Sequence, residues 1–507
     1  MKKNMMLLMI VTVLSILSGF VRELILANFF GASSISDAYI ISLTIPQTIF
    51  GFVGACLSTT FIPVYRSLYE KEGTLTANRF TSNLMNLLLV LSVFLIVIVF
   101  SFTAQIVKVF AAGFDEEVLS LAVTFTRISV FGVFFSGLSF VISCFLQSKS
   151  RFLFTGLMSV PLNIVNILSI YLGYRFNIYY LVVGSVVAFI GQLLFLIYDL
   201  RRSDFQYYRL IDFSDVNIKK LVRLAVPALF GNSIYQLNVI FDRTLASGIL
   251  AGGISILSYS ERVTALVYSI SSVPIFTVMY PYLSAMIASK NQTGFKIAVN
   301  RSIVLILILV IPASVGTMVF SREIITLLYG RGEFDASAID LASNVLVFYA
   351  IGNVGTATRD LLHRSFYAMQ ETKIPAINSG ISLLINIVLN IILSSFMGLN
   401  GLALATSIAE IIASGLQFYQ LRKKVGPFGL KQIGFTSLRI ILAAVIMGVS
   451  ARWLYDTLVM NLNELTSLFI AIICAILLYC GLIYLLKVEE MSSLVNELKL
   501  KFKMISK

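Results

Sequence analysis

The stretch "GFVRELILANFFGASSISDAYIISLTIP", from Gly19 to Pro46, carries Arg22 and Glu23 inside one apolar run and Asp37 at the start of the next. A charged side chain at the centre of a membrane-spanning helix costs at least ~2.5–3.5 kcal/mol on insertion scales, so it is not expected to face lipid. Adjacent residues point to different faces of a helix, so Glu23 is expected to point away from Arg22. The stretch predicts two membrane-spanning helices with charges directed inward.

The composition extends this prediction to the whole chain. Its 507 residues are 58% hydrophobic and 12% charged, with a mean hydropathy of +0.92, which excludes a set of soluble cores. The apolar runs are long enough for helices and too long for barrel strands. We expect an all-α polytopic membrane protein with about fourteen spans, at 5–29, 37–65, 82–104, 118–146, 153–173, 178–199, 222–247, 253–286, 302–320, 338–364, 375–397, 401–420, 436–456 and 465–486.

The basic residues give this arrangement an orientation. When the spans alternate, most lysines and arginines fall on the side of the N-terminus, where they indicate the cytoplasm. They account for the net charge of +13 without a nucleic-acid partner. We therefore expect both termini in the cytoplasm of a multi-pass protein of the bacterial plasma membrane, in contact with membrane lipids.

The sequence also contains a weak internal repeat. "FLQSKSRFLFTGLMSVPLNIVN" (Phe145–Asn166) is similar to "YAMQETKIPAINSGISLLINIVLN" (Tyr367–Asn390), which pairs Gln147 with Gln370. The offset equals six spans, an even number, so the two copies have the same orientation in the membrane. We expect a six-helix lobe at 1–205, a second at 206–425, and a terminal helix pair with a cytoplasmic tail at 426–507.

No motif for covalent chemistry is present. The sequence lacks the phosphate-binding loop of ATPases, the nucleophile elbow of hydrolases and the paired histidines of zinc proteases. Its single histidine, His363, has no cysteine or carboxylate cluster that would complete a zinc site. We predict that the protein is not an enzyme and that its function lies among the intramembrane charges, which are Arg22, Glu23, Asp37, Arg127, Asp242, Arg243, Glu261, Arg262 and Arg359.

Three blocks of sequence resemble a known family. They are the opening stretch, "ITLLYGRGEFDASAIDLASNVLVFYAIG" (Ile325–Gly352), and "FYAMQETKIPAINSGISLLINIVLN" followed by "GLNGLALATSIAEII". Together they resemble the MurJ/MviN lipid flippases of the multidrug/oligosaccharidyl-lipid/polysaccharide exporter superfamily. The resemblance implies two six-helix lobes that carry an undecaprenyl-pyrophosphate-linked glycan, lipid II in the named family, from the inner to the outer leaflet by alternating access.

The resemblance also implies site residues. Arg22 matches the family's first-helix arginine that faces the cavity, Asp37 the acidic residue that opens the second helix, and Arg262 the eighth-helix arginine, which makes these three the candidate substrate-binding residues. Arginine suits a pyrophosphate because it offers paired donors to phosphate oxygens. Three further family positions that are usually charged are uncharged here, at Ile16, Phe50 and Ala265. These departures leave open a relative that carries a capsular, exopolysaccharide or teichoic-type precursor.

A sodium site is implied by resemblance to family members that bind this ion. The matching positions are Asp242, Asn386, Asn390, Leu402 and Thr406. Asn386 and Asn390 share a helix face, as do Leu402 and Thr406, because each pair is four residues apart. The driving force is then a monovalent cation or the membrane potential, and no other cofactor is expected.

Two other classes of function are compatible with parts of the sequence. A drug/cation antiporter shares the superfamily fold, although its cavity typically contains acidic residues rather than arginines. A scaffold for cell-envelope synthesis enzymes, without transport, would tolerate replacement of both Arg22 and Arg262.

Overall fold

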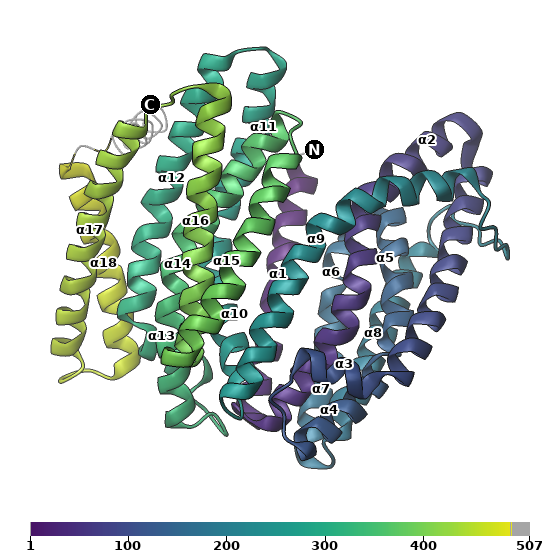
Figure 1. The fold of residues 1–507 in the computed structure, drawn as a ribbon, viewed down its shortest axis with the longest axis horizontal. Helices are drawn as coiled ribbons and strands as arrows, with labels where there is room; N and C mark the ends of the chain where they lie inside the picture. The colour runs from purple at the N-terminus through teal and green to yellow at the C-terminus, as the bar shows by residue number, and fades with distance from the viewer. Residues whose placement is uncertain (1, 487, 489–507) are drawn as a thin grey trace. The chain divides into compact units, whose positions relative to one another are not determined.

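The computed structural model describes residues 2–486 and 488, and within them the chain is built from helices (Figure 1). The helices are α1 (Lys2–Phe30), α2 (Ser34–Ser101), α3 (Thr103–Phe110), α4 (Glu116–Ser129), α5 (Gly132–Ser148), α6 (Phe152–Leu157), α7 (Ser159–Arg175), α8 (Tyr179–Leu200), α9 (Val216–Ile249), α10 (Gly253–Ser271), α11 (Val273–Ala288), α12 (Gln292–Val319), α13 (Ser321–Tyr329), α14 (Ala336–Ala368), α15 (Lys373–Met397), α16 (Leu399–Val425), α17 (Leu430–Leu458) and α18 (Glu464–Leu485). The predicted cytoplasmic tail lies largely outside the described residues. The all-α fold class agrees with the prediction.

Several predicted spans have breaks inside them. The predicted span 118–146 is the pair α4 and α5, bent by 43°, and the predicted span 253–286 is the pair α10 and α11, bent by 47°. The second break falls at Ser272, directly before Val273 and Pro274, because proline lacks the N–H that a continuous helix requires. At the first break, the new helix begins at Gly132.

One element is longer than predicted. The predicted spans 37–65 and 82–104 belong mainly to α2, which continues through the polar segment between them. Gly73 interrupts this element with a φ of +84°, a conformation that glycine adopts without the strain a side chain brings. In the part of the chain open to this test, ten helices are long and apolar enough to cross a membrane, or up to twelve if each bent pair is one span.

The chain forms two compact units. The first unit comprises Met1–Ser255 with Arg331–Ala338, and the second comprises Ile256–Gly330 with Ile339–Lys507. In the first unit α2 packs against α4, α5 and α9, while α7 packs against α1 and α8. The sequence division at 205 and 425 stays a prediction.

The linker after α8 is held against α2 by buried asparagines. Asn83, which is fully buried, donates to the carbonyl of Asp212 at 2.9 Å and accepts from its N–H at 2.8 Å. Asn86 donates to the carbonyl of Leu210 at 2.8 Å. Because buried backbone groups need partners, these amides fix the linker on α2.

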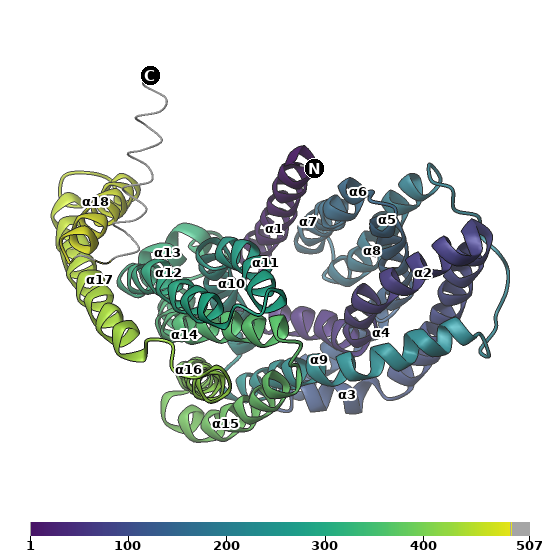
Figure 2. The same ribbon diagram turned by 90° about the horizontal axis from the view of Figure 1, so that it is seen from above.

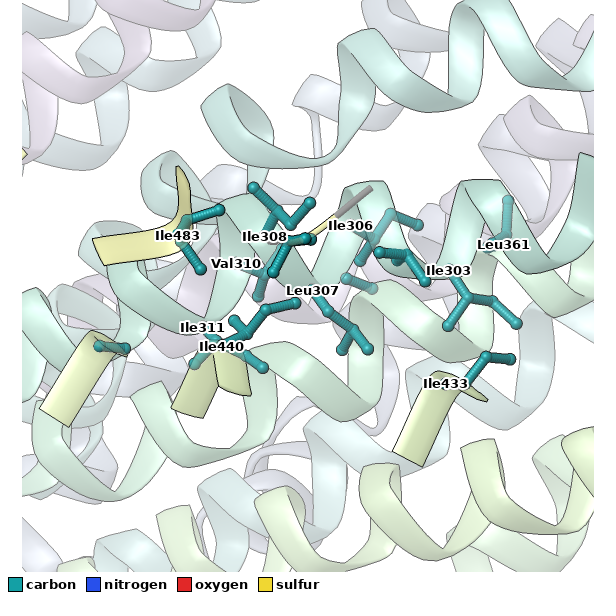
Figure 3. Close-up of a cluster of buried hydrophobic side chains, with 14 of the residues drawn as sticks. Ile303, Ile306, Leu307, Ile308, Val310, Ile311, Leu361, Ile433, Ile440 and Ile483 are labelled. Carbon is teal, nitrogen blue, oxygen red and sulfur yellow. The ribbon is translucent and has the colours of Figure 1, made fainter. Parts of the chain in front are cut away.

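The second unit has an aliphatic core around α12. Ile303, Ile306, Leu307, Val310 and Ile311 of α12 are buried together with Leu361 of α14, Ile440 of α17 and Ile483 of α18 (Figure 3). The terminal pair α17 and α18 packs on α12, and α15 packs along α16 (Figure 2). The terminal pair is therefore part of the second unit.

Candidate substrate and cation sites

Arg22 forms an ion pair with its neighbour in α1. Its Nη2 lies 2.6 Å from Oε1 of Glu23, and the two side chains are 19% and 9% exposed. The prediction that Glu23 points away from Arg22 is therefore wrong: both side chains are long enough to close the angle between neighbouring helix positions. Within the described residues this is the one hydrogen bond that Arg22 donates, so Nε and Nη1 remain available to a ligand.

Asp37 acts as a cap for another helix. Its carboxylate is 1% exposed and accepts from the backbone N–H groups of Gly252 at 2.9 Å and Ser255 at 2.7 Å, and from the Ser255 hydroxyl at 2.6 Å. A carboxylate at the N-terminus of a helix satisfies N–H groups that have no partner within the helix. These contacts are sufficient to explain Asp37 by its hold on the start of α10, and its contact with substrate stays a prediction.

Arg262 lies on an exposed part of α10 in the second unit. It belongs to a different unit from Arg22, and the binding of a pyrophosphate by these two arginines stays a prediction.

Four of the five predicted cation ligands lie together on α15 and α16. Asn390 donates to Oδ1 of Asn386 at 2.8 Å, and Asn386 donates to Oγ1 of Thr406 at 3.1 Å. The Thr406 hydroxyl in turn donates to the carbonyl of Leu402 at 3.1 Å. The chain of bonds places several neutral oxygens close together without a carboxylate.

The fifth ligand, Asp242, lies on α9 in the first unit. A hard cation favours oxygen ligands, and Asp242 is the member of the set that carries a formal charge. Among the described residues, no group of three or more histidine, cysteine, aspartate and glutamate side chains is placed to hold a metal ion.

The second unit contains a charged network that was not predicted from the sequence. Arg359 of α14 pairs with Glu410 of α16 and, at 3.2 Å, with its own neighbour Asp360. Tyr268 of α10 donates to the other oxygen of Asp360. Arg359 itself is visible in the sequence as an intramembrane charge, but its second carboxylate partner, Glu410, comes from a helix distant in sequence.

His363 belongs to the same face of α14. Its Nε2 lies 2.6 Å from Nε2 of Gln417, a fully buried residue of α16. This contact gives His363 a structural hydrogen bond.

Comparison with known proteins identifies the family. The profile of the family described as "Lipid II flippase MurJ" matches residues 26–483, which is most of the chain. The chain belongs to the MurJ family. The probable lipid II flippase MurJ of Thermotoga maritima is 29% identical over 96% of both chains, and that of Vibrio cholerae is 28% identical over 93% of this chain and 94% of its own.

Solved structures agree with this assignment. A lipid II flippase MurJ in an inward closed conformation matches with a TM-score of 0.81 at 26% identity, over 95% of this chain and 99% of that one. An inward-facing MATE family multidrug transporter matches with a TM-score of 0.70 at 16% identity, over 81% and 94% of the two chains. The second match shows a common fold. The resemblance noted in the sequence is thus confirmed, and the chain is a multi-pass membrane protein of the MurJ family.

Proposed function

We propose that this protein is a flippase that carries lipid II from the inner to the outer leaflet of the bacterial plasma membrane by alternating access. The observation that carries the proposal is the match to the MurJ family across residues 26–483. The relatives from Thermotoga maritima and Vibrio cholerae are probable lipid II flippases. This similarity favours lipid II as the substrate over capsular or teichoic-type precursors.

The chemistry required is binding and release. No bond of the substrate is broken, so the protein needs groups that hold a pyrophosphate and let it go, and it acts without enzymatic catalysis. Arg262, together with Arg22, supplies charge-assisted donors for phosphate oxygens. The ion pair with Glu23 leaves donors of Arg22 available and limits the cost of keeping its charge in the membrane.

The test is flipping of a fluorescent lipid-linked glycan by the purified protein in vesicles. Each lost charge-assisted hydrogen bond is worth about 1.5–3 kcal/mol, so Arg262→Ala should flip about ten- to a hundredfold more slowly. Arg322→Ala, which removes an exposed arginine of α13 paired with Asp340, is the matched control. Wild-type vesicles that flip no lipid-linked glycan would refute the function.

Arg22 needs a modified test because its removal leaves a buried carboxylate. The double variant Arg22→Ala/Glu23→Gln keeps the site neutral, and we expect it to fold and to flip as slowly as Arg262→Ala. Normal flipping by both variants would remove the arginines from substrate binding.

The predicted cation ligands define how we propose that lipid flipping is coupled to an ion gradient. Sodium held by Asp242 with the oxygens of Asn386, Asn390, Leu402 and Thr406 would drive the conformational cycle. Asp242→Asn removes the charged ligand and should abolish sodium dependence while the protein still folds. If wild-type flipping does not respond to sodium, membrane potential acting on the cavity arginines replaces the ion in this proposal.

The proposed orientation places both termini in the cytoplasm, beside the enzymes that make the substrate. A cysteine at exposed Glu72 should react only from the cytoplasm, and one at exposed Glu333 only from outside. Glu72 is preferred to its neighbour Gly73, whose φ of +84° a cysteine would strain. Reversed labelling would contradict the orientation.

A further inference from the structure

The first unit contains a cavity of about 370 Å³ between helices α2, α5, α8 and α9. Its polar lining includes Gln47, Gln192, Gln236, Ser136 and Ser139. The lining residues that the structure describes include no lysine, arginine, aspartate or glutamate. A cavity of this size falls within the range of small-molecule sites, and its mainly apolar lining carries a few uncharged polar groups.

Aromatic rings form part of the wall, and glycines bring them close to the helix backbones. A methyl group at Gly132 would lie 2.7 Å from the ring of Phe189, and one at Gly137 would lie 2.7 Å from the ring of Phe50. Any larger residue at these positions would displace the rings. The wall is thus shaped by two phenylalanines of α2 and α8 that pack directly on α5.

The polar groups in the wall are only partly used by the protein. Gln192 is 7% exposed and lines the cavity, yet no hydrogen bond joins its amide to any residue that the structure describes. The hydroxyls of Ser136 and Ser139 donate to carbonyls of their own helix, which leaves their oxygen lone pairs as acceptors. The Gln192 amide and these lone pairs are therefore available to a ligand, so this cavity has the donor and acceptor groups of a binding site.

We propose that this cavity binds an uncharged sugar ring of the lipid-linked glycan. The inference rests on the proposed flippase function and adds a second subsite to it. Amide and hydroxyl groups match sugar hydroxyls, each of which donates and accepts, and phenylalanine rings match the apolar C–H faces of a sugar ring. The uncharged wall disfavours the pyrophosphate, and a hydrocarbon chain would leave the glutamine and serine groups of the wall without partners.

The experiment compares two lipids that differ only in the sugar. Purified protein in detergent is titrated with undecaprenyl pyrophosphate and with undecaprenyl pyrophosphate that carries an N-acetylated hexosamine. For Gln192→Leu we expect about two- to tenfold weaker binding of the glycosylated lipid, the effect of one or two neutral hydrogen bonds, and unchanged binding of the bare lipid. Gln147→Leu is the matched control, because the Gln147 amide donates to Ser143 within α5, and it should bind both lipids as wild type does.

The outcomes separate the subsite from the flippase function. Equal loss of both lipids in Gln192→Leu, or no loss of either, would overturn the sugar subsite while wild-type binding still supports the function. Failure of the wild-type protein to bind either lipid would overturn both. A thermal melt accompanies each titration, and Gln192→Leu should melt close to wild type because the lost amide makes no hydrogen bond to any residue that the structure describes.

Discussion

Each of the two units has an ion pair between the ends of two of its helices, and the acidic and basic partners are exchanged between the units. In the first unit Nζ of Lys149, just after α5, lies 2.8 Å from Oδ2 of Asp204, which follows α8. In the second unit Nζ of Lys424, in the last turn of α16, lies 2.6 Å from Oε2 of Glu371, which follows α14. The acid and the base have exchanged places between the two units. Both positions therefore keep an ion pair, although the helix that supplies the acid differs between the units.

The turns next to these pairs have the same geometry. Ser150 has a φ of +61° and Gln370 a φ of +59°, an unusual conformation for residues other than glycine. Each turn is closed by a hydrogen bond back into the preceding helix, from Arg151 N–H to the Leu146 carbonyl and from Glu371 N–H to the Phe366 carbonyl. The structure therefore aligns Ser150 with Gln370. The sequence similarity instead aligns Gln147 with Gln370, so the two alignments differ by three positions.

The interiors of the two units differ far more than their ends. The first unit has an uncharged cavity whose polar groups come from glutamines and serines, while the second contains Arg359 between Glu410 and Asp360. Burial of two carboxylates with one guanidinium is costly unless all three stay together. The two units thus have similar turns and ion pairs at the ends of their helices, but the groups in their interiors are uncharged in the first unit and charged in the second.

The largest predicted effect concerns the interior of the second unit. Arg359→Ala should lower stability by about 3–5 kcal/mol, because it leaves Glu410 and Asp360 partly buried without a countercharge. The measurement is the thermal melt of the purified protein. The triple variant Arg359→Met/Asp360→Leu/Glu410→Leu should recover most of the loss, and a triple variant as unstable as Arg359→Ala would show that the charges themselves are required.

The second prediction compares the asparagines that hold the linkers. Asn83 makes two hydrogen bonds to the backbone of Asp212, whereas Asn300 of α12 donates one bond, of 2.8 Å, to the carbonyl of Phe428. Loss of a buried partner costs about 1–3 kcal/mol, so Asn83→Ala should destabilise the protein more than Asn300→Ala does. Melting curves of both variants decide this, and equal shifts would show that the second bond of Asn83 contributes little.

The sequence predicted the helical fold because length and hydrophobicity of a span are local properties. It missed the break at Ser272, since Pro274 lies in an apolar run that otherwise satisfies the pattern. It indicated Arg359 but not Glu410, because the two lie on helices separated by α15. The cavity around Gln192 had no sequence signal, since neutral polar residues in membrane helices most often bond between helices.

A third prediction tests the exchanged ion pairs. The reversal Lys149→Glu/Asp204→Lys copies the polarity of the second unit and should fold, whereas Lys149→Glu alone places two acids together and should melt lower. The gain from restoring the pair is about 0.2–1 kcal/mol, typical of exposed ion pairs. The reversed pair should remain somewhat below wild type, because Nζ of Lys149 also lies 3.8 Å from the ring centre of Tyr69, and a carboxylate loses this attraction. A reversed pair no better than the single variant would contradict the equivalence.

The smallest effect is a dependence on pH in the second unit. The hydrogen bond from Lys424 lowers the pKa of Glu371 below its ordinary value of 4.5. A carboxyl whose pKa falls on folding stabilises the folded state above its unfolded pKa, and this contribution disappears as the pH falls through the folded pKa. The difference in melting temperature between wild type and Glu371→Gln should therefore be small at pH 7 and vanish when the pH is taken below the folded pKa of Glu371. Because Glu371 is solvated, added salt should shrink the same difference at pH 7. A difference that persists in acid and in salt would mean that the Glu371 side chain acts through packing and that the ion pair is incidental.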